Sequence, residues 1–281
     1  MSLRNISNAQ YGPWALITGG SSGIGKAFAE QLAAHGLNLI LVARRQPLLD
    51  QAAKEIGGKY GVQVKTISAD LSDLASVEAL KAETQPYEIG LFIPNAGIEN
   101  HGEFIHNDLN RETKIIRLNI MVPMQLAHHY SRKMVDRGRG GIIFVSSTLG
   151  YSGVPYFSNY AATKAYVLAF GEGLSYEMKS LGVDVTVLSP GGTDTPMADN
   201  MGFDMKSMPF PMMTPEDTAV AGLKALGKKT SVIPGFQNNV MTFMSTRLMP
   251  RGTTVSMFGG LLKKALDGAK AQVQQTNPSN S

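Results

Sequence analysis

A glycine-rich turn near the N-terminus constrains the fold of this chain more than any other segment. Residues 18–25 read T-G-G-S-S-G-I-G, follow a short apolar run over 14–17 and open a helical pattern over 26–32. Glycine lets the backbone turn sharply and come close to a ligand. A helix start offers unpaired N–H groups and a partial positive charge to a phosphate. A strand, a turn and a helix in this order therefore predict a dinucleotide phosphate site.

The same segment comes close to a second phosphate-binding pattern. Gly20, Gly25 and Lys26 fit the spacing G-x-x-x-x-G-K of a P-loop. However, Ala27 stands where a P-loop needs Ser or Thr to hold magnesium. We expect a dinucleotide site, and a P-loop nucleotide hydrolase or an ordinary glycine-rich turn are the alternatives.

The composition bounds the class of protein. The chain has 281 residues, of which 43% are hydrophobic and 17% charged, so we expect a sizeable buried core. No apolar run reaches the roughly 18 residues of a membrane span, and the N-terminus lacks the apolar stretch of a secretory signal. The absence of cysteine excludes disulfides and thiolate metal sites, and the histidines lack metal-binding spacing. We therefore expect a cytoplasmic protein with no metal site and no membrane span.

The net charge of +4 is mildly basic, and no single tract of Lys and Arg dominates. The densest cluster consists of Arg132, Lys133, Arg137 and Arg139, at the end of a predicted helix. Cations at a helix C-terminus interact favourably with the helix dipole. The cluster therefore indicates a solvated helix end, and we expect no nucleic-acid partner.

Short apolar runs alternate with helical patterns along most of the chain. The runs are nearly continuous in Val, Ile, Leu and Ala, which is typical of parallel strands covered on both faces. They cover residues 14–18, 38–43, 62–68, 89–94, 141–146, 184–189 and 231–233. The helical patterns cover residues 24–35, 46–58, 73–83, 111–137, 159–181 and 215–227. This alternation predicts an α/β fold with a doubly wound, parallel, Rossmann-like sheet.

We expect a single Rossmann-like domain over residues 12–235, which binds the dinucleotide and carries the catalytic site. Within it, residues 196–213 contain six methionines, three prolines and two phenylalanines, a composition that suits a flexible substrate flap. Packing of this segment against the core or a neighbouring subunit is the alternative. A C-terminal helical extension follows over 236–270, and the polar segment 271–281 is predicted to be disordered.

Tyr160 and Lys164 begin a long helical pattern and lie on the same helix face. A nearby cation lowers the pKa of a phenol, which can then exchange a proton near neutral pH. Alone, this pair is common on surface helices. However, Ser147 follows an apolar strand, and polar or glycine segments at 95–97 and 190–195 follow two others. The carboxyl ends of parallel strands share one edge of the sheet, where ligands bind.

Together these motifs resemble those of the short-chain dehydrogenase/reductase family, over about residues 12–235. In chain order they are T-G-x-x-x-G-x-G at 18–25, Asp70, N-A-G at 95–97, Asn119, Ser147, Y-x-x-x-K at 160–164 and P-G-x-x-x-T at 190–195. Ser147 precedes Tyr160 by thirteen positions, the interval usual in the family. Pro94 departs from the family's pattern, which most often has a second Asn there.

The resemblance implies hydride transfer between a nicotinamide and a carbonyl or alcohol. Tyr160 would donate a proton to the carbonyl oxygen, and Ser147 would polarise that oxygen. Lys164 would lower the pKa of Tyr160 and hold the nicotinamide ribose. Asn119 would position a water for a proton relay, although a satisfied mid-helix Asn is the alternative.

The resemblance also implies cofactor contacts along the same edge of the sheet. Asp70 would contact the adenine, and its neighbour Leu71 would touch the ring. The full predicted set is Gly19, Ser21, Ser22, Gly23, Ile24, Gly25, Arg44, Arg45, Asp70, Leu71, Asn95, Ala96, Gly97, Tyr160, Lys164, Pro190, Gly191, Thr193 and Thr195.

The end of the second predicted strand distinguishes between two cofactors. NAD-binding proteins place a carboxylate there to accept a hydrogen bond from the ribose 2′-OH. Here Arg44 and Arg45 follow the strand, and an Arg fork suits a 2′-phosphate. The sequence therefore predicts NADP(H) with Arg44 as the main phosphate contact, and two exposed surface arginines are the alternative.

We therefore expect an NADP(H)-dependent oxidoreductase that acts on a small-molecule ketone or secondary alcohol. Phe203, Met205, Phe210 and Met212 in the flap suggest a bulky or apolar substrate. The family resemblance suggests a homodimer or homotetramer formed through the helices at 111–137 and 159–181.

Two other functions on the same fold stay open. A 3-oxoacyl reductase acting on a carrier-bound substrate would need a basic entrance, which Arg111, Lys114 and Arg117 are the candidates to form. A noncatalytic dinucleotide-sensing protein would need no acid, and the intact set of Ser147, Tyr160 and Lys164 argues against it.

Overall fold

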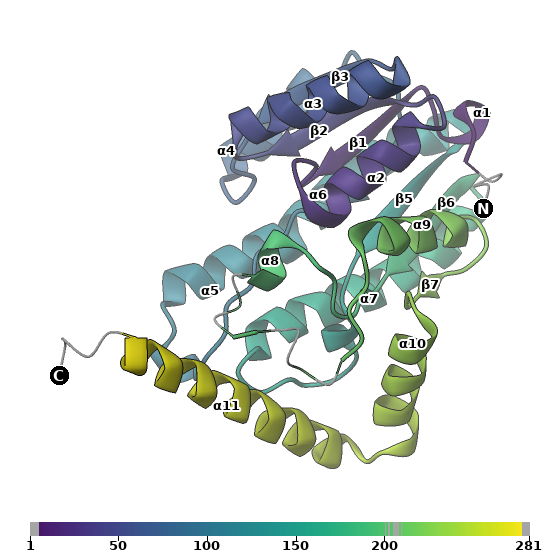
Figure 1. Ribbon diagram of the computed structural model, residues 1–281. Helices are drawn as coiled ribbons and strands as arrows, with labels where there is room; N and C mark the ends of the chain where they lie inside the picture. Colours follow the sequence, from purple (N-terminus) through teal and green to yellow (C-terminus); the bar gives the residue numbers. More distant parts are fainter. Residues whose placement is uncertain (1–5, 200, 202, 205–207, 209, 277–281) are drawn as a thin grey trace.

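The structure is a computed structural model that describes residues 6–199, 201, 203, 204, 208 and 210–276. Within this part of the chain, seven strands form one parallel sheet in the order β3-β2-β1-β4-β5-β6-β7 (Figure 1). The strands are β1 (Trp14–Thr18), β2 (Asn38–Ala43), β3 (Val64–Ser68), β4 (Ile89–Pro94), β5 (Gly140–Val145), β6 (Val183–Leu188) and β7 (Ser231–Val232). The predicted doubly wound α/β fold is confirmed; β1, β2 and β4 have the predicted boundaries, and the other four strands differ by one or two residues.

Helices cover both faces of the sheet, and each face has its own hydrophobic cluster. One face packs against α2 (Gly23–Ala33), α3 (Gln46–Tyr60) and α9 (Pro215–Ala225). The other packs against α4 (Leu74–Glu83), α6 (Val122–Arg137) and α7 (Ser158–Lys179). Successive residues of β1 alternate between the two clusters, with Ala15 and Ile17 on one side and Leu16 on the other. Burial on both faces explains why the strands read as continuous apolar runs.

The helix predicted over 111–137 consists of three parts. They are α5 (Leu109–Ile116), a π-helical turn over Arg117–Met121, and α6. Pro123 has no N–H group, so it cannot bond to the carbonyl of Asn119 as an α-helix requires. The π turn accommodates this interruption and places Asn119 inside it.

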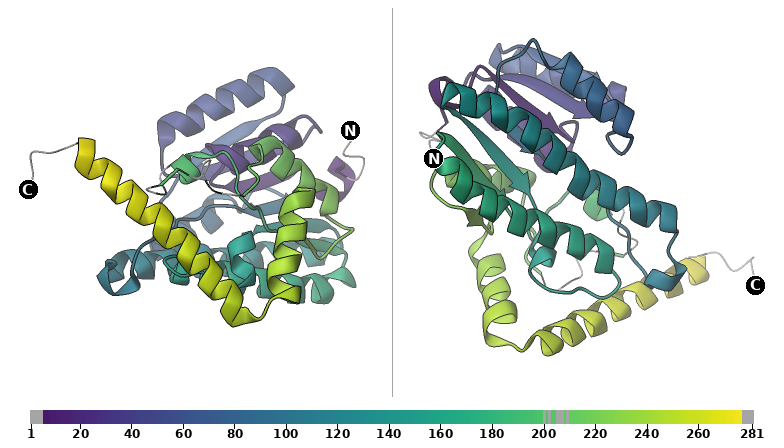
Figure 2. Two further views of the ribbon diagram at one scale, coloured as in Figure 1. Left: turned by 60° about the horizontal axis from the view of Figure 1, so that its bottom comes forward. Right: turned by 180° about the vertical axis from the view of Figure 1, so that it is seen from behind.

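The C-terminal extension is helical and folds back beside the carboxyl edge of the sheet. It consists of α10 (Phe236–Phe243), a π-helical turn over Met244–Leu248 and α11 (Arg251–Thr276), which runs along the lower side of the molecule in Figure 1 and crosses below α7 in Figure 2. The helix α11 continues through 271–276, which differs from the disorder predicted for 271–281, and 277–281 lie outside the described residues. Among the described helices, none is long and apolar enough to cross a membrane.

Four shorter elements complete the described chain. They are α1 (Asn8–Tyr11), η1 (Phe104–His106), η3 (Thr148–Tyr151) and α8 (Pro196–Asp199).

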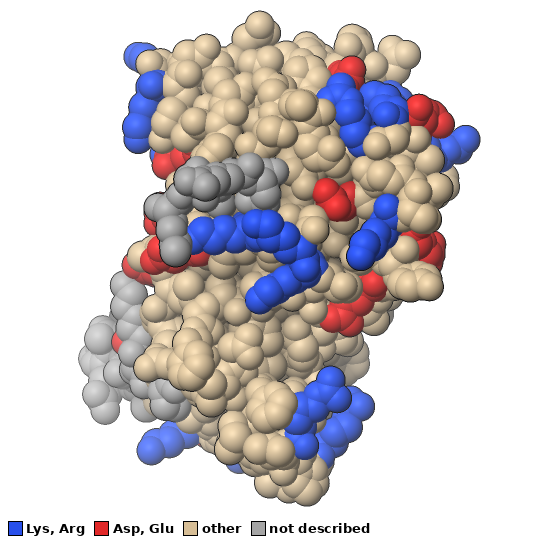
Figure 3. Space-filling model, turned by 90° about the vertical axis from the view of Figure 1, so that its right-hand side faces the viewer, with Lys and Arg blue, Asp and Glu red and all other residues tan. Residues whose placement is uncertain are grey.

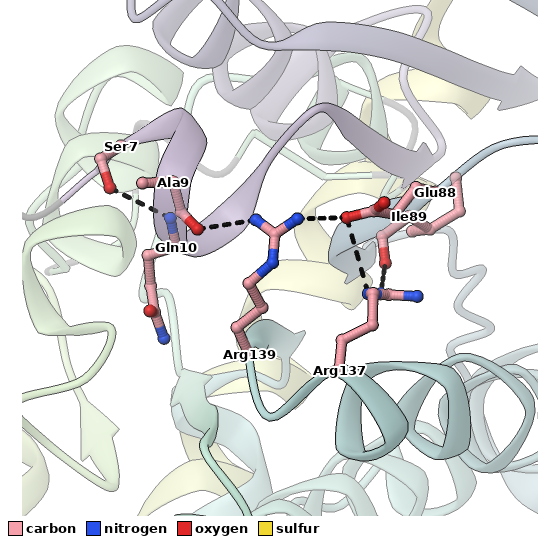
Figure 4. A network of polar contacts seen from close by, with 7 residues as sticks. All are labelled: Ser7, Ala9, Gln10, Glu88, Ile89, Arg137 and Arg139. Carbon is pink, nitrogen blue, oxygen red and sulfur yellow. Dashed lines mark hydrogen bonds and ion pairs between the residues drawn. The ribbon is translucent and has the colours of Figure 1, made fainter.

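The arginines at the end of α6 are bound to other parts of the protein, which corrects the expectation of a solvated helix end. Arg139 donates to a carboxylate oxygen of Glu88 and to the backbone oxygen of Ala9 (Figure 4). Arg137 donates to the backbone oxygen of Ile89 at 2.7 Å, and its Nε lies 3.6 Å from Glu88. The network fastens the end of α6 to α1 and to the start of β4. On the face shown in Figure 3, Lys and Arg lie in separate groups with Asp and Glu between them.

Glu88→Gln should lower the free energy of unfolding by roughly 1–3 kcal/mol, because two partly buried guanidinium groups lose their shared carboxylate. Urea unfolding near neutral pH measures the change. Glu83→Gln is the matched control. Glu83 pairs with Lys65 and is more exposed than Glu88, so its loss should lower the free energy of unfolding by less than about 1 kcal/mol. Equal losses in the two variants would contradict the structural role given to Glu88.

Candidate active site

Gly19 and Gly25 show why the turn between β1 and α2 requires glycine. Gly19 has a φ of 70°, in the left-handed region. A Cβ on Gly25 would lie 2.2 Å from the backbone oxygen of Gly19. Ser22, the N-cap of α2, makes no side-chain hydrogen bond to the helix, so its side chain leaves the first N–H groups uncapped. The turn is therefore a cradle of backbone donors that fits a pyrophosphate.

Lys26 does not take the part that a P-loop lysine takes. Its Nζ donates to Glu55 on α3 at 2.6 Å and lies 3.9 Å from Glu30. The side chain is thus held against α3. This contact, together with Ala27, argues against the P-loop alternative.

The turn is tied to the end of β4 by two side chains. Asn95 Nδ2 donates to the backbone oxygen of Thr18 at 3.0 Å, and Thr18 Oγ1 accepts from the N–H of Ala96 at the same distance. Farther along, a Cβ on Gly97 would lie 3.2 Å from Asn119 Oδ1 and 3.6 Å from Lys164 Nζ. The segment 95–97 therefore lies between the phosphate turn and the predicted catalytic residues.

The far end of the site carries charged groups of both signs. Arg44 and Arg45 follow β2 and line the cavity described below, as does Asp70 after β3. Although burial alone would raise it, hydrogen bonds from Ser72 and Lys114 lower the pKa of Asp70 to about 2. Asp70 is therefore ionised at neutral pH and can accept hydrogen bonds.

A cavity of about 390 Å³ runs along the carboxyl edge of the sheet and joins these parts. Every residue of the predicted catalytic and cofactor sets lines it except Gly25 and Asn119. Gly25 is buried beneath the turn, and Asn119 lies behind Ile98. The predicted residues from distant parts of the sequence are thus brought together at one site.

Tyr160 and Lys164 line this cavity and are almost completely buried. Each has 6% of its surface exposed, and Lys164 Nζ lies 5.6 Å from the centre of the Tyr160 ring. Lys164 Nζ donates to the backbone oxygen of Val145 at 3.0 Å. Ser147 lies at the end of β5 and accepts from the N–H of Leu149. Phenol, hydroxyl and amine therefore come from two elements, α7 and the end of β5.

The pKa of Tyr160 differs from the value expected from the sequence. Burial raises it well above that of a free phenol, the negative charge of Glu99 raises it further, and the side chain of Ser147 lowers it. Burial also lowers the pKa of Lys164 to about 8. The low polarity of the site thus disfavours both charged forms. In the protein alone, Tyr160 is held as a proton donor rather than as a phenolate.

Asn119 makes hydrogen bonds with both ends of its side chain. Oδ1 accepts from the N–H of Ile98 at 3.0 Å, and Nδ2 donates to the oxygen of Ile98 at 2.9 Å and to Thr163 Oγ1 at 3.1 Å. It therefore joins the segment after β4 to α7, one residue before Lys164. These hydrogen bonds connect the segment after β4 to α7, and the role of Asn119 in positioning a water remains a prediction.

A buried carboxylate that the sequence analysis did not single out joins two loop positions to the start of α7, near Tyr160. Glu112 on α5 is 4% exposed and accepts from the side-chain amides of Asn100, Asn107 and Asn159 at 2.9, 2.7 and 2.5 Å. Asn159 immediately precedes Tyr160. No sequence motif could reveal this centre, because its donors come from three separate segments.

The part of the cavity beyond Tyr160 is mostly apolar. The flap leaves the carboxyl edge after β6 and returns to it, where Thr193 and Met213 form a parallel bridge. Phe203 and Phe210 line the cavity as predicted, Met212 does not, and Met205 lies outside the described residues. The extension adds Met257, Phe258 and Leu262 from an apolar segment whose sequence suits either covering a pocket or meeting a neighbouring subunit. It also adds lining residues that the sequence analysis missed: Asn238, Met241, Thr242, Ser245 and Thr246.

Comparison with known proteins adds a family and several relatives. The family model of the short chain dehydrogenases matches residues 13–206. The chain is 34% identical over 241 residues to the 7beta-hydroxysteroid dehydrogenase of Collinsella aerofaciens, which covers 85% of this chain and 90% of that protein. It is 33% identical over 243 residues to the very-long-chain 3-oxoacyl-CoA reductase-B of Danio rerio, with 85% and 76% covered.

Solved structures of dehydrogenases are also similar to this chain. A structure from a study of 7beta-hydroxysteroid dehydrogenase stereoselectivity has a TM-score of 0.83 and 32% identity, and covers 92% of this chain and 100% of that one. The short-chain dehydrogenase of Sphingobium yanoikuyae in complex with NADPH has a TM-score of 0.73 and 32% identity, with 79% and 87% covered. The bulky-bulky ketone specific alcohol dehydrogenase of Comamonas testosteroni has a TM-score of 0.72 and 28% identity, with 80% and 87% covered.

The lowered pKa of Lys164 predicts how stability depends on pH. Between about pH 8 and pH 10, the unfolded chain keeps a proton on this lysine that the folded protein releases, so stability should rise by up to about 1.4 kcal/mol per pH unit. Urea unfolding of the cofactor-free protein across this range measures the slope. Above the ordinary tyrosine pKa of 10.0, the buried phenol of Tyr160 acts in the opposite direction.

Lys164→Met is the control for this slope, because it has no amine to titrate. The same rise with pH in both proteins would show that another group causes it.

Proposed function

Because the chain belongs to the short-chain dehydrogenase family, we propose that it interconverts bulky, largely apolar ketones and their secondary alcohols, with hydroxysteroids as the substrate class. The chain is an NADP(H)-dependent oxidoreductase that acts on carbonyl and alcohol groups. One observation carries the proposal for the substrate. Beyond Tyr160 and Ser147, the cavity extends between the flap and the C-terminal helices as a mostly apolar space.

The residues present fit NADP(H). The glycine turn would offer backbone donors to the pyrophosphate, and Arg44 and Arg45, which line the cavity after β2, would hold a 2′-phosphate. Asp70 is ionised and would accept from the adenine amine. When bound, NADP(H) supplies the hydride that a carbonyl carbon accepts or takes the one that an alcohol carbon gives.

The side chains of the protein manage the proton. Tyr160 stays protonated at neutral pH because it is buried, so it can donate to the oxygen of a ketone as that oxygen gains negative charge. Ser147 would hold the same oxygen by a hydrogen bond. Lys164 lies against the ring of Tyr160, where a proton on its amine would stabilise the phenolate left after transfer. We propose these three as the catalytic groups. Asn119 would position Lys164 through its hydrogen bond to the neighbouring Thr163.

Reduction of a 3-oxoacyl thioester is the second candidate, since relatives such as the Danio rerio protein carry that name. The basic entrance that a carrier would need is not formed by the predicted residues. Lys114 pairs with Asp70 at 3.0 Å, and Arg111 donates to the backbone oxygen of Glu99. Of the three, Arg117 alone is exposed, and Arg111 and Lys114 are partly buried. This observation favours the hydroxysteroid class.

We also propose a cytoplasmic homodimer or homotetramer formed through α5, α6 and α7. Tyr176 on α7 is 88% exposed and Tyr166 is 37% exposed, and Ile116 on α5 is 41% exposed. Large exposed apolar side chains on neighbouring helices suit a contact with a second copy.

Arg44→Ala should raise the KM for NADPH about 10- to 100-fold, since a charge-assisted hydrogen bond contributes about 1.5–3 kcal/mol. Steady-state kinetics with a ketone substrate measures it, and the KM for NADH should change little. Arg45→Ala is the matched control and should have the smaller effect. A loss shared equally between NADPH and NADH would show that Arg44 does not contact the 2′-phosphate.

Tyr160→Phe should lower kcat about 10²- to 10⁴-fold, because it removes the proton donor while keeping the ring that fills the site. Fluorescence titration with NADPH should give an affinity close to that of the wild type. A variant that retains most of its activity would refute the role of Tyr160. A variant that no longer binds NADPH would show that the hydroxyl group serves cofactor binding.

A further inference from the structure

The helix α10 and the π turn after it give the cavity one polar wall. Asn238, Thr242, Ser245 and Thr246 line the cavity from this segment, at the spacing that puts them on one helical face. Around them lie Met208, Phe210, Phe258 and Leu262, which belong to an apolar cluster together with Tyr160. All four polar residues lie outside the range matched by the family model, so the family resemblance assigns them no role.

Two of these side chains are mostly buried, and each has one polar atom that makes no hydrogen bond to the described residues. Asn238 is 6% exposed, and its Nδ2 donates to the backbone oxygen of Pro234 at 3.2 Å. No described residue donates to its Oδ1. Thr242 is 8% exposed, and within the described chain its Oγ1 makes no hydrogen bond. Both groups line the cavity, where a ligand that excludes water would leave them unsatisfied unless it pairs with them.

The neighbouring hydroxyl groups are already used, which sets these two apart. Thr246 Oγ1 donates to the backbone oxygen of Thr242 at 2.6 Å, and Ser245 Oγ donates to the same oxygen at 3.1 Å. Both bonds are made within the helical segment, so these two hydroxyl groups have a hydrogen-bond partner without a ligand. The unpartnered pair therefore consists of one acceptor, Asn238 Oδ1, and one hydroxyl that can donate or accept, Thr242 Oγ1.

The charge of the surroundings selects the chemical group that would fit this pair. The charged residues that line the cavity are Arg44, Arg45, Asp70 and Lys164, and none of them belongs to the described part of α10 or the flap. A carboxylate or phosphate on the ligand would therefore lack a cation beside α10. A hydroxyl group meets both needs, because it donates to Asn238 and accepts from Thr242.

Contacts with the segments after β5 and β6 place the pair at the carboxyl edge of the sheet. A Cβ on Gly191, just after β6, would lie 2.6 Å from Asn238 Oδ1. The helix α10 also packs against η3, which directly follows Ser147. A substrate held at Ser147 and Tyr160 would thus have its body between the apolar cluster and this polar wall.

We propose that Asn238 and Thr242 form a hydroxyl-binding subsite and that the substrate is an apolar ketone with a hydroxyl group away from the reacting carbon. The subsite rests on the proposed function, because it assumes that a ketone occupies the cavity. It selects among ketones by a hydrogen bond that a deoxy analogue cannot make, which leaves two buried polar groups unpaired.

The test compares a matched pair of ketones with NADPH: a 7-oxosteroid that carries one further ring hydroxyl and the same oxosteroid without it. We expect the wild type to favour the hydroxylated ketone by about tenfold or more in kcat/KM. Thr242→Val keeps the shape of the side chain and should remove most of this preference. Thr242→Ser keeps the hydroxyl and should preserve it.

Thr246→Val is the matched control, since it removes a cavity-lining hydroxyl that already has a partner, and the preference should survive. An equal rate for both ketones in the wild type would overturn the subsite, as would a preference that Thr242→Val leaves intact. A Thr242→Val variant that changes the KM for NADPH instead would assign the pair to the cofactor and also overturn it.

Failure of the proposed function gives a different result, in which neither oxosteroid is reduced. Calorimetric titration of the two ketones into the NADPH complex of Tyr160→Phe then tests the subsite without turnover. Tighter binding of the hydroxylated ketone, lost in the double variant with Thr242→Val, supports the subsite. Binding of both ketones with equal affinity, or of neither, overturns it.

Discussion

The parallel direction of the sheet is the constraint on which the rest of this structure depends. Because the described strands all run the same way, the segments that follow them emerge at one edge. The glycine turn after β1, Arg44 after β2, Asp70 after β3 and Ser147 after β5 meet there although they are far apart in sequence. An antiparallel pairing of any of these strands would send its polar end to the opposite edge. The site is thus a consequence of topology before it is one of side-chain chemistry.

Burial decides the electrostatics of the catalytic centre. Tyr160 belongs to an apolar cluster and Lys164 is buried beside its ring, so desolvation acts on both and favours the neutral form of each. Glu99 adds a negative charge that holds the proton on Tyr160 more tightly. A neutral phenol beside a lysine that gains a proton below about pH 8 is suited to donate one proton and then accommodate the resulting charge. Burial of these two ionisable groups lowers the stability of the folded protein, a cost that is common at reactive sites.

The sequence predicted the features that local pattern determines. The strands were visible as apolar runs, because both faces of the sheet are buried. Tyr160 and Ser147 were found from helix spacing and from a strand end, and both line the cavity. The cofactor set followed from strand ends and from the family resemblance, and its roles remain predictions.

The features that escaped prediction depend on contacts between distant segments. Glu112 has the look of an ordinary helix residue until its three asparagine partners are in place. Arg139 was interpreted as solvated because Glu88, its partner, lies 51 positions earlier. The pKa of Tyr160 was expected to fall, since the sequence showed the nearby lysine but not the depth of burial. Pattern thus gives the elements, and tertiary packing gives their surroundings.

The origin of the cavity wall in α10 has a consequence for how such a protein diversifies. The family match ends at residue 206, whereas the polar wall comes from residues 238–246. The proposed proton-transfer groups therefore lie inside the matched range, whereas part of the proposed substrate wall lies beyond it. A substitution in α10 would alter that wall and leave Ser147, Tyr160 and Lys164 unchanged, so substrate preference could shift while the proposed chemistry is kept.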